Sequence, residues 1–373
     1  MLSRIRIDNH RCFVNFDFRP KPKQLILGLN GAGKSAFLGV LQNLRDFALA
    51  GSKVDALFNS ENRTRWQTLS RQTFELEVIG NAGIYLYTLW VETDDSQPRS
   101  RVIKESLDFN EQPLILFHED QVRLFDDNHL EKAIYPFDSD RSAVAVLGPR
   151  KANSKIDWFK NWLYHLYCLR IDPSQMGAEA KVEAGSDEYP EDDLSNFAAW
   201  YGHIIQERTA STIKLQQSLR EVIDGFDSLD LKKVGRRDRE LLASFRGQGA
   251  KKSTLEFDLD ELSDGQKVLI ALYTLLHFAV ERETTICIDE PDNFLALAEI
   301  QPWLLELSDR IDDESSQVIL VSHHPEVIDM LAPKHGVVFY RDGFGPVRAE
   351  QYRSDLVNKL RPSELIARGW ERE

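Results

Sequence analysis

The chain has 373 residues, 42% of them hydrophobic and 28% charged, which is ordinary for a globular protein large enough to bury a sizeable core. Its net charge of −14 excludes nucleic-acid binding by the surface as a whole, because contacts to phosphates require lysines and arginines. The longest apolar run, at 269–280, is too short to span a bilayer, and N-terminal arginines argue against an export signal. We expect a cytoplasmic protein without membrane contact, and three widely spaced cysteines fit that reducing compartment.

The N-terminal segment predicts a loop that binds nucleotide phosphates. Alternating apolar residues at 4–18 predict a strand pair, and an apolar strand at 25–27 leads into GLNGAGKS at 28–35 and a helical pattern. In such a loop, backbone N–H groups and the helix N-terminus attract phosphates, Lys34 adds a positive charge, and Ser35 is placed to hold Mg²⁺. The predicted phosphate-binding residues are Gly28, Asn30, Gly31, Ala32, Gly33, Lys34 and Ser35.

The segment after the first helix has the pattern of an antiparallel sheet. Residues 74–92 alternate around a GNAG turn at 80–83, which predicts a hairpin. Further strands are predicted at 101–109, 114–118 and 122–125. The polar stretch 52–73 gives no firm secondary-structure prediction.

The middle of the chain is predicted to be helical. Apolar spacing of three and four begins near residue 155, an acidic segment at 173–193 predicts an exposed loop, and a second helical region follows at 194–226. Between Lys232 and Lys252 the chain carries an excess of basic residues. This run indicates either a solvated face or a contact with nucleic acid or an acidic partner.

A helix that is predicted to start near residue 263 has the features of an anion-binding site. Ser263 and Gln266 have the spacing of a capping box ahead of an amphipathic helix. Together with Gly265 they form a helix N-terminus, and such an end attracts negative charge. The capping and the anion-binding interpretations are compatible.

Two apolar strands near the C-terminus end in polar side chains. The first, at 285–288, ends in Asp289 and Glu290, where Asp289 would bind Mg²⁺ mainly through water and Glu290 would orient or deprotonate the attacking water. The second, at 318–321, is followed by His323 and His324, and a histidine there could bind the terminal phosphate. A last strand at 337–340 and a terminal helix at 354–367 are also predicted.

Four motifs resemble those of the ABC-type ATPase superfamily and cover nearly the whole chain. They are GLNGAGKS at 28–35, LSDGQ at 262–266, IDEPDN at 288–293 and VSHH at 321–324. The large separation of Lys34 and Ser263 is similar to that in the SMC/RecF-like and overcoming-lysogenization-defect (OLD) group of AAA ATPases rather than in transporter subunits. The resemblance implies an α/β fold: an ABC-type P-loop ATPase head with a mixed β-sheet, an attached antiparallel β lobe and an inserted helical region.

The same resemblance implies a division of the chain into domains. The head would comprise 1–150 and 255–350, a helical insertion with an acidic loop would occupy 151–254, and a C-terminal helix or tail would occupy 351–373. We expect neither the nuclease domain of OLD-type enzymes nor a long coiled coil.

The resemblance further implies an ATPase that uses Mg²⁺ and converts ATP to ADP and phosphate. ATP would lie between two heads of a head-to-tail homodimer, with Ser263, Gly265 and Gln266 facing the phosphates bound by the other copy. Glu290 would be the catalytic base, His323 the preferred switch residue, and Arg11 would reach the phosphates. Asp264 replaces a glycine of the family motif. The Mg²⁺-binding glutamine has three candidates, which are Gln67, Gln72 and Gln121.

Three functions follow as hypotheses. The first is a switch that regulates a separately encoded effector, such as a nuclease or toxin, in bacterial anti-phage defence, with oligomers larger than a dimer left open. The second is a RecF-like DNA-repair clamp that binds DNA through the segment between Lys232 and Lys252. The third is the motor of a transporter. This function is disfavoured because it does not explain the helical insertion or the antiparallel lobe.

Overall fold

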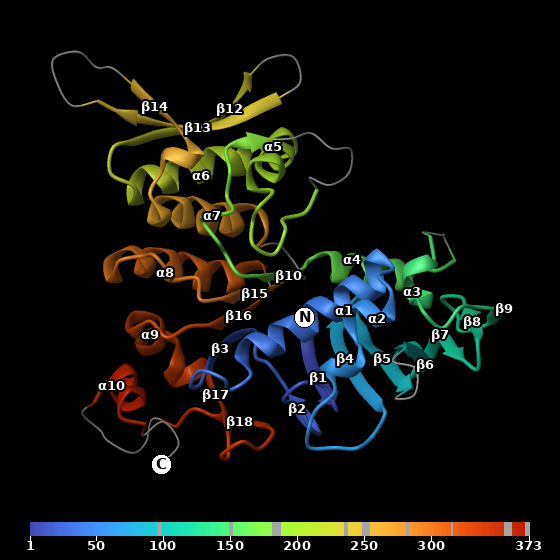
Figure 1. Cartoon of the computed structure of the whole chain (residues 1–373). Helices are drawn as coiled ribbons and strands as arrows, with labels where there is room; N and C mark the ends of the chain where they lie inside the picture. Colours follow the sequence, from blue (N-terminus) through green and yellow to red (C-terminus); the bar gives the residue numbers. More distant parts are fainter. Residues whose placement is uncertain are drawn as a thin grey trace.

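The computed structural model describes residues 1–94, 99–148, 152–180, 188–234, 238–247, 254–280, 283–314, 316–353 and 360–369. Within these ranges the chain forms three β-sheets with helices packed around them (Figure 1). The predicted α/β class is confirmed, because a mixed central sheet carries an antiparallel lobe and an insertion. None of the described helices is long and apolar enough to cross a membrane.

The central sheet has six strands in the order β10-β15-β16-β3-β17-β18, and only its last pair is antiparallel. All residues of β15 and β16 are buried, which is typical of parallel strands covered on both faces and explains their apolar sequences. The strands predicted next to the phosphate loop and the two histidines are thereby confirmed. The bounds are Leu166–Leu169 (β10), Thr285–Asp289 (β15), Gln317–Val321 (β16), Lys23–Leu27 (β3), Gly336–Arg341 (β17) and Val347–Gln351 (β18).

The antiparallel lobe is a sheet of eight strands in the order β2-β1-β4-β5-β6-β7-β8-β9. The predicted strand pair, hairpin and three following strands are confirmed, but β9 was not predicted because this edge strand is largely exposed and lacks buried alternation. The bounds are Leu2–Asp8 (β1), Phe16–Phe18 (β2), Arg71–Gly80 (β4), Gly83–Asp94 (β5), Arg99–Phe109 (β6), Gln112–His118 (β7), Gln121–Phe125 (β8) and Glu131–Pro136 (β9).

The predicted helices are present, and the second helical region consists of two helices, α5 and α6. The polar stretch 52–73 contains the short helix α2. Of the predicted terminal helix only α10 is seen, and residues 354–359 lie outside the described ranges. The bounds are Lys34–Ala50 (α1), Val54–Leu57 (α2), Ala143–Val146 (α3), Ser154–Tyr164 (α4), Phe197–Glu207 (α5), Thr209–Val222 (α6), Asp264–Phe278 (α7), Leu297–Glu314 (α8), Pro325–His335 (α9) and Pro362–Ala367 (α10).

The insertion is not only helical, since it also contains a small sheet that the sequence pattern did not predict. Strand β13 pairs with β12 on one side and with β11 and β14 on the other. Leu229 and Leu241 are buried against the helices. Many charged residues lie between the buried positions of these strands, so the sequence does not show the alternation of apolar and polar residues that predicts a strand. The basic segment between Lys232 and Lys252 therefore falls largely on strands, although residues 235–237 and 248–253 lie outside the described ranges. The bounds are Glu179–Ala180 (β11), Phe226–Val234 (β12), Asp238–Arg246 (β13) and Thr254–Asp258 (β14).

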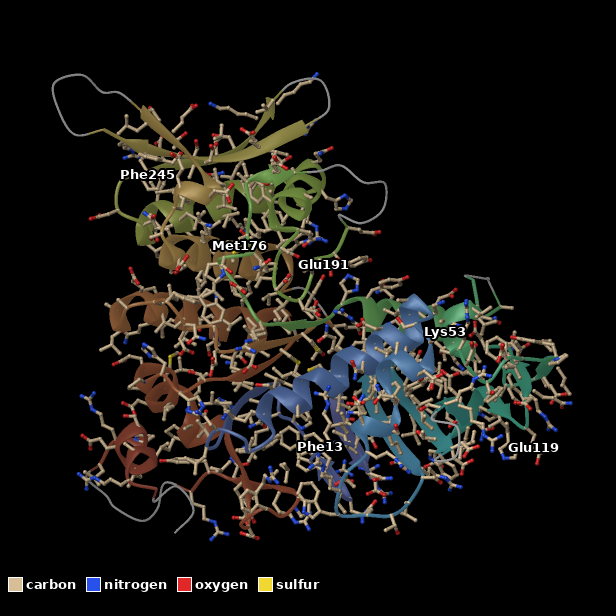
Figure 2. The ribbon with its side chains drawn as sticks, in the orientation of Figure 1. Phe13, Lys53, Glu119, Met176, Glu191 and Phe245 are labelled. Atoms are coloured by element: carbon tan, nitrogen blue, oxygen red, sulfur yellow. The ribbon has the colours of Figure 1, made fainter. Side chains whose placement is uncertain are left out.

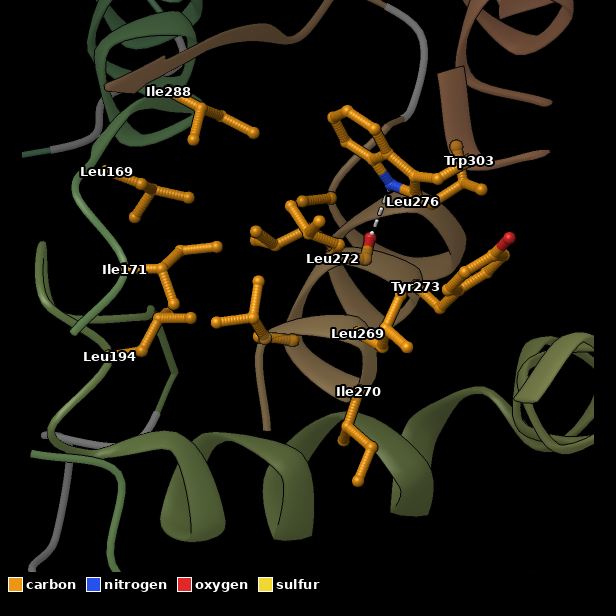
Figure 3. Packing of buried hydrophobic residues seen from close by; sticks show 14 of the residues in the cluster. Leu169, Ile171, Leu194, Leu269, Ile270, Leu272, Tyr273, Leu276, Ile288 and Trp303 are labelled. Carbon is orange, nitrogen blue, oxygen red and sulfur yellow. Dashed lines mark hydrogen bonds between the residues drawn. The ribbon is translucent and has the colours of Figure 1, made fainter. Parts of the chain in front are cut away.

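Two hydrophobic cores lie on opposite faces of the central sheet, because successive strand residues point to opposite faces. Ile286 and Ile288 of β15 belong to a core shared with α7, α8 and α9, whereas Cys287 between them belongs to a core shared with α1 and the antiparallel lobe. Figure 3 shows the first core, where Trp303 of α8 donates its indole N–H to the Leu272 carbonyl oxygen of α7 at 3.1 Å. Both faces of the strands that end at the candidate site are thus packed.

Gln317, at the start of β16, links the central sheet to the antiparallel lobe. Its side chain is 1% exposed and makes four hydrogen bonds. The Oε1 atom accepts from the Leu2 N–H at 2.9 Å and from the Thr285 hydroxyl at 3.1 Å. The Nε2 group donates to the carbonyl oxygens of Leu2 at 2.9 Å and Lys21 at 3.2 Å. This side chain therefore fixes the first strand of the lobe against the central sheet.

Gln317→Ala is expected to lower the free energy of unfolding by about 2–4 kcal/mol, because both backbone groups of Leu2 lose a buried partner. Gln112→Ala, at an exposed position in β7, serves as the matched control and is expected to change it by less than about 0.5 kcal/mol. Urea titrations of both variants measure the difference. Equal unfolding midpoints for the two variants would disprove this role of Gln317.

Candidate nucleotide site

The phosphate loop between β3 and α1 has a backbone that requires glycine. Gly28 has φ = 142°, and a Cβ at this position would lie 2.2 Å from the Phe339 carbonyl oxygen. Gly31 and Gly33 also have positive φ, and Gly33 precedes α1 without a side chain that caps this helix. The first N–H groups of α1 are therefore left for a ligand, as an anion site at a helix N-terminus requires.

The Lys34 side chain contacts the backbone of the phosphate loop. Its Nζ donates to the carbonyl oxygens of Gly28 at 2.7 Å and Leu29 at 3.2 Å, and the residue is 7% exposed. Burial lowers the pKa of Lys34, while the nearby Asp289 and Glu290 carboxylates oppose this shift. The side chain lies within the electrostatic reach of both acids and provides the cation that a phosphate needs.

The two acidic residues lie at the end of β15, on the same sheet edge as the phosphate loop. Asp289 pairs with Val321 of β16, and Val321 pairs in turn with Ile26 of β3. The Glu290 N–H donates to the Val321 carbonyl oxygen at 2.8 Å, and its φ of 53° is unusual for a residue with a side chain. Asn293 donates its side-chain N–H to Glu290 Oε2 at 2.8 Å, which orients that carboxylate.

Asp292 is a further acid of this motif to which the sequence pattern assigned no role. It is 9% exposed, and its Oδ1 is a buried atom without a hydrogen-bond partner among the described residues. Burial raises the pKa of Asp292, and a hydrogen bond with Ser322 opposes this shift. The IDEPDN motif contains Asp292 and could have drawn attention to it. The sequence does not show, however, that this acid is buried, because burial depends on the folded structure.

The two histidines after β16 have different surroundings. His324 caps α9: its Nδ1 accepts from the Glu326 N–H at 3.2 Å, and its own N–H donates to the Ser322 hydroxyl at 3.0 Å. His323 instead faces the charged groups, since partial burial and then Lys34 lower its pKa, while Glu290 opposes the shift. A lowered pKa means that the imidazole is neutral at neutral pH. His324 is thus occupied by the helix cap, whereas the preferred His323 faces Lys34 and Glu290.

The helix start at 263–266 is a capping box, as the sequence predicted. The Ser263 hydroxyl accepts from the Gln266 N–H at 3.3 Å, and Gln266 Oε1 accepts from the Ser263 N–H at 3.1 Å. Gly265 is required by packing, because a Cβ there would lie 2.9 Å from the Phe294 carbonyl oxygen. Asp264 is exposed. Within the described residues no hydrogen bond joins Ser263 or Gly265 to the phosphate loop.

Arg11 lies beside the phosphate-loop helix, whereas the hydrogen bonds of Gln67 and Gln72 go to other parts of the chain. Arg11 donates its Nε–H to Asn62 at 3.4 Å, and its guanidinium lies beside Gly39 of α1. Gln72 is occupied by His10 and two carbonyl oxygens, and Gln121 lies in β8 of the lobe. Gln67 follows Trp66, whose ring is 5.1 Å from the Arg341 guanidinium. That guanidinium contacts the Gly31 carbonyl oxygen of the phosphate loop at 3.4 Å.

The residues present fit a nucleotide with Mg²⁺. A cavity of about 350 Å³ adjoins the loop on the side of β17 and is lined by residues 28–32, by β17 and by the β17–β18 turn, whereas Lys34, Asp289 and His323 do not line it. No cluster of three or more histidine, cysteine or acidic side chains in the described ranges forms an all-protein metal site. Ser35 and Asp289 offer oxygen donors of the kind that Mg²⁺ uses, since this ion is usually held by one or two side chains together with phosphate oxygens and water.

Comparisons with known proteins agree with this fold. One family model, described as "AAA domain, putative AbiEii toxin, Type IV TA system", matches residues 25–329. An Smc head bound to the C-winged helix domain of ScpA is 13% identical, with a TM-score of 0.53, and the match covers 94% of this chain and 98% of that chain. An Smc head with an extended coiled coil, bound to the C-terminal domain of ScpA derived from Pyrococcus furiosus, is 13% identical, with a TM-score of 0.51 and coverages of 94% and 96%. No curated protein matches the chain in sequence. The predicted ATPase-head fold is confirmed.

Proposed function

The chain belongs to the AAA-domain family whose model spans residues 25–329, and from this premise we propose that it is an ATP-hydrolysing switch that dimerises head to tail around ATP. The observation that carries the proposal is that Lys34 of the phosphate loop lies within electrostatic reach of the acids Asp289 and Glu290 and of His323. These groups come from three adjacent parallel strands, so they share one sheet edge.

Each residue has a separate task in hydrolysis. Lys34 and the N–H groups at the start of α1 hold the phosphates. Ser35 and Asp289 would hold Mg²⁺, which neutralises phosphate charge when bound. The Glu290 carboxylate accepts a proton from the attacking water, and neutral His323 donates an N–H to the terminal phosphate. The products are ADP and phosphate.

A second copy would complete the site. Ser263 is exposed and Gly265 half-buried, and in one chain neither is bonded to the phosphate loop. In a head-to-tail dimer the start of α7 would face the phosphates held by the other copy, where the positive end of a helix stabilises negative charge. Two ATP molecules would then join two heads, and assemblies larger than the dimer remain compatible with this geometry.

The proposed biological role is control of a separately encoded effector, a nuclease or toxin, in bacterial anti-phage defence. The family description names a toxin of a type IV TA system, and both Smc heads with a similar fold are bound to parts of ScpA. A head that changes its dimeric state with ATP could likewise hold or release a protein partner.

A DNA-repair clamp is the alternative, supported by the exposed Lys232 and Lys233. Within the described residues the positive charge of this segment is partly neutralised, since Lys232 pairs with Glu256 and Arg246 pairs with Asp227 at 3.1 Å. This pairing favours the switch.

One experiment separates the switch from the clamp. Purified protein is expected to hydrolyse ATP with Mg²⁺ and not with EDTA, and Lys232→Gln/Lys233→Gln is expected to leave both hydrolysis and any DNA affinity unchanged. For a clamp, the plot of log affinity against log salt would become flatter by about one unit for each phosphate that the variant no longer neutralises. Filter-binding titrations with duplex DNA at several salt concentrations measure that slope, and a flatter slope in the variant would refute the switch as the main role.

A further inference from the structure

A second cavity, of about 290 Å³, lies at the far end of α1 from the phosphate loop. The α1 residues that line it, from Arg45 to Ala50, lie about 17–24 Å along the helix from Lys34, at 1.5 Å per residue. Its walls come from the last turns of α1, the end of α4, β10 and the loop around Glu191, which Figure 2 labels. We call this cavity the tyrosine pocket, after its lining residues Tyr164, Tyr167 and Tyr189. None of these residues has a task in the proposed ATP cycle.

Aromatic rings form much of the tyrosine pocket. The rings of Tyr164 and Tyr189 are stacked, with centroids 5.2 Å apart and planes 18° apart. Tyr164 is 40% exposed, so a large aromatic side chain is accessible from solvent, whereas Tyr167 is buried. Faces of aromatic rings attract cations, and a planar guanidinium also stacks on them.

The charge in the tyrosine pocket is negative. Arg45, Asp46 and Glu191 line the cavity, and Asp192 lies beside them, so the three acids stand against one cation. Arg45 is held by Asp46 at 3.1 Å, by Asp192 at 3.4 Å and by the Leu166 carbonyl oxygen at 3.2 Å. Burial raises the pKa of Asp192 to about 6, with Asp46 and Glu191 adding to the shift and Arg45 opposing it. One guanidinium therefore does not neutralise these acids.

We propose that the tyrosine pocket binds an arginine side chain of a protein partner. The pocket joins the two features that a guanidinium uses, aromatic faces and carboxylates, and Glu191 makes no side-chain hydrogen bond or ion pair among the described residues, which leaves it for a ligand. The inference rests on the proposed function and deepens it, since it names a docking point for the effector at the end of the helix that begins in the phosphate loop.

Fluorine NMR of protein labelled with 3-fluorotyrosine tests this proposal. The probe is acetyl-Gly-Arg-Gly-amide, and the control peptide carries citrulline, which has the shape of arginine without its charge. Signals of Tyr164 and Tyr189, assigned through Tyr→Phe variants, are expected to shift saturably with the arginine peptide only. No shift, or equal shifts with both peptides, would overturn the proposal.

Two variants test which residues of the tyrosine pocket bind the arginine peptide. Glu191→Gln is expected to weaken binding of the arginine peptide about ten-fold, as loss of one charge-assisted contact requires. Tyr189→Leu is expected to abolish the saturable shift of Tyr164. Glu119→Gln, an exposed acid in the β7–β8 turn, is the matched control and is expected to bind as wild type. Unchanged binding by both Glu191→Gln and Tyr189→Leu would overturn the assignment.

The peptide titration needs no nucleotide, so its result does not depend on whether the proposed ATP cycle is correct. Wild-type hydrolysis with no response to the arginine peptide would refute the tyrosine pocket alone. A response to the peptide in a protein that neither hydrolyses ATP nor dimerises would refute the ATP cycle alone.

Discussion

Glu290→Gln is expected to slow ATP hydrolysis by about 100-fold or more while ATP remains bound, because a neutral amide cannot accept a proton from water. The amide oxygen can still accept the hydrogen bond from Asn293, and the backbone bond to Val321 is unchanged, so the local fold is expected to persist. The variant should therefore accumulate as an ATP-bound dimer. Phosphate release in single-turnover experiments measures the rate, and native mass spectrometry with and without Mg²⁺ and ATP measures the dimer.

The matched control for this variant is Glu119→Gln, the same chemical change at an exposed turn of the antiparallel lobe. It is expected to hydrolyse ATP as wild type. Hydrolysis by Glu290→Gln at the wild-type rate would show that another group is the base, and Asp292, the buried acid two residues on, would be the next residue to test.

Lys34→Ala is expected to have the opposite effect on the dimer. Removing the buried ammonium group costs a charge-assisted contact to phosphate of roughly 3 kcal/mol, so ATP affinity should fall about 100-fold. Without bound ATP the two heads lose the ligand that joins them, and the variant should stay monomeric at ATP concentrations that dimerise Glu290→Gln. Titration with a fluorescent ATP analogue measures the affinity, and native mass spectrometry measures the oligomeric state.

Lys53→Ala controls for loss of a lysine near the end of the same helix. Lys53 is exposed, pairs with Asp140 at 3.5 Å and lies beyond the end of α1 that is far from the loop, so its loss is expected to leave ATP affinity unchanged. If Lys34→Ala bound ATP as tightly as Lys53→Ala, the phosphate-loop assignment would be wrong.

The backbone and strand ends that form the candidate site could be predicted because their determinants are local. The glycines at 28, 31 and 33 adopt positive φ, and the acids and histidines follow buried strands, so short motifs carried both the backbone and the chemistry. The capping box at Ser263 was equally local. His323 is preferred over His324 because it directly follows the serine at the strand end, and only the structure shows that His324 caps α9.

The parts that could not be predicted depend on long-range contacts. Strands β12–β14 carry many charges on their exposed side, so their apolar residues become recognisable only once the helices beneath them are placed. The burial of Asp292 and the joining of Tyr164 to Tyr189 each bring together residues from separate elements. No spacing along the chain encodes such contacts.

The head-to-tail composite site is the central claim, and mixing two inactive variants tests it most directly. Lys34→Ala lacks the phosphate contact, whereas Ser263→Asp keeps a good helix cap but places a carboxylate against the phosphates of the other copy. Each variant alone is expected to be inactive. An equal mixture is expected to recover hydrolysis that neither variant shows alone, at most about half of the wild-type rate, because each mixed dimer has one complete site of two. A mixture as inactive as its components, or full activity of Ser263→Asp alone, would contradict the composite site.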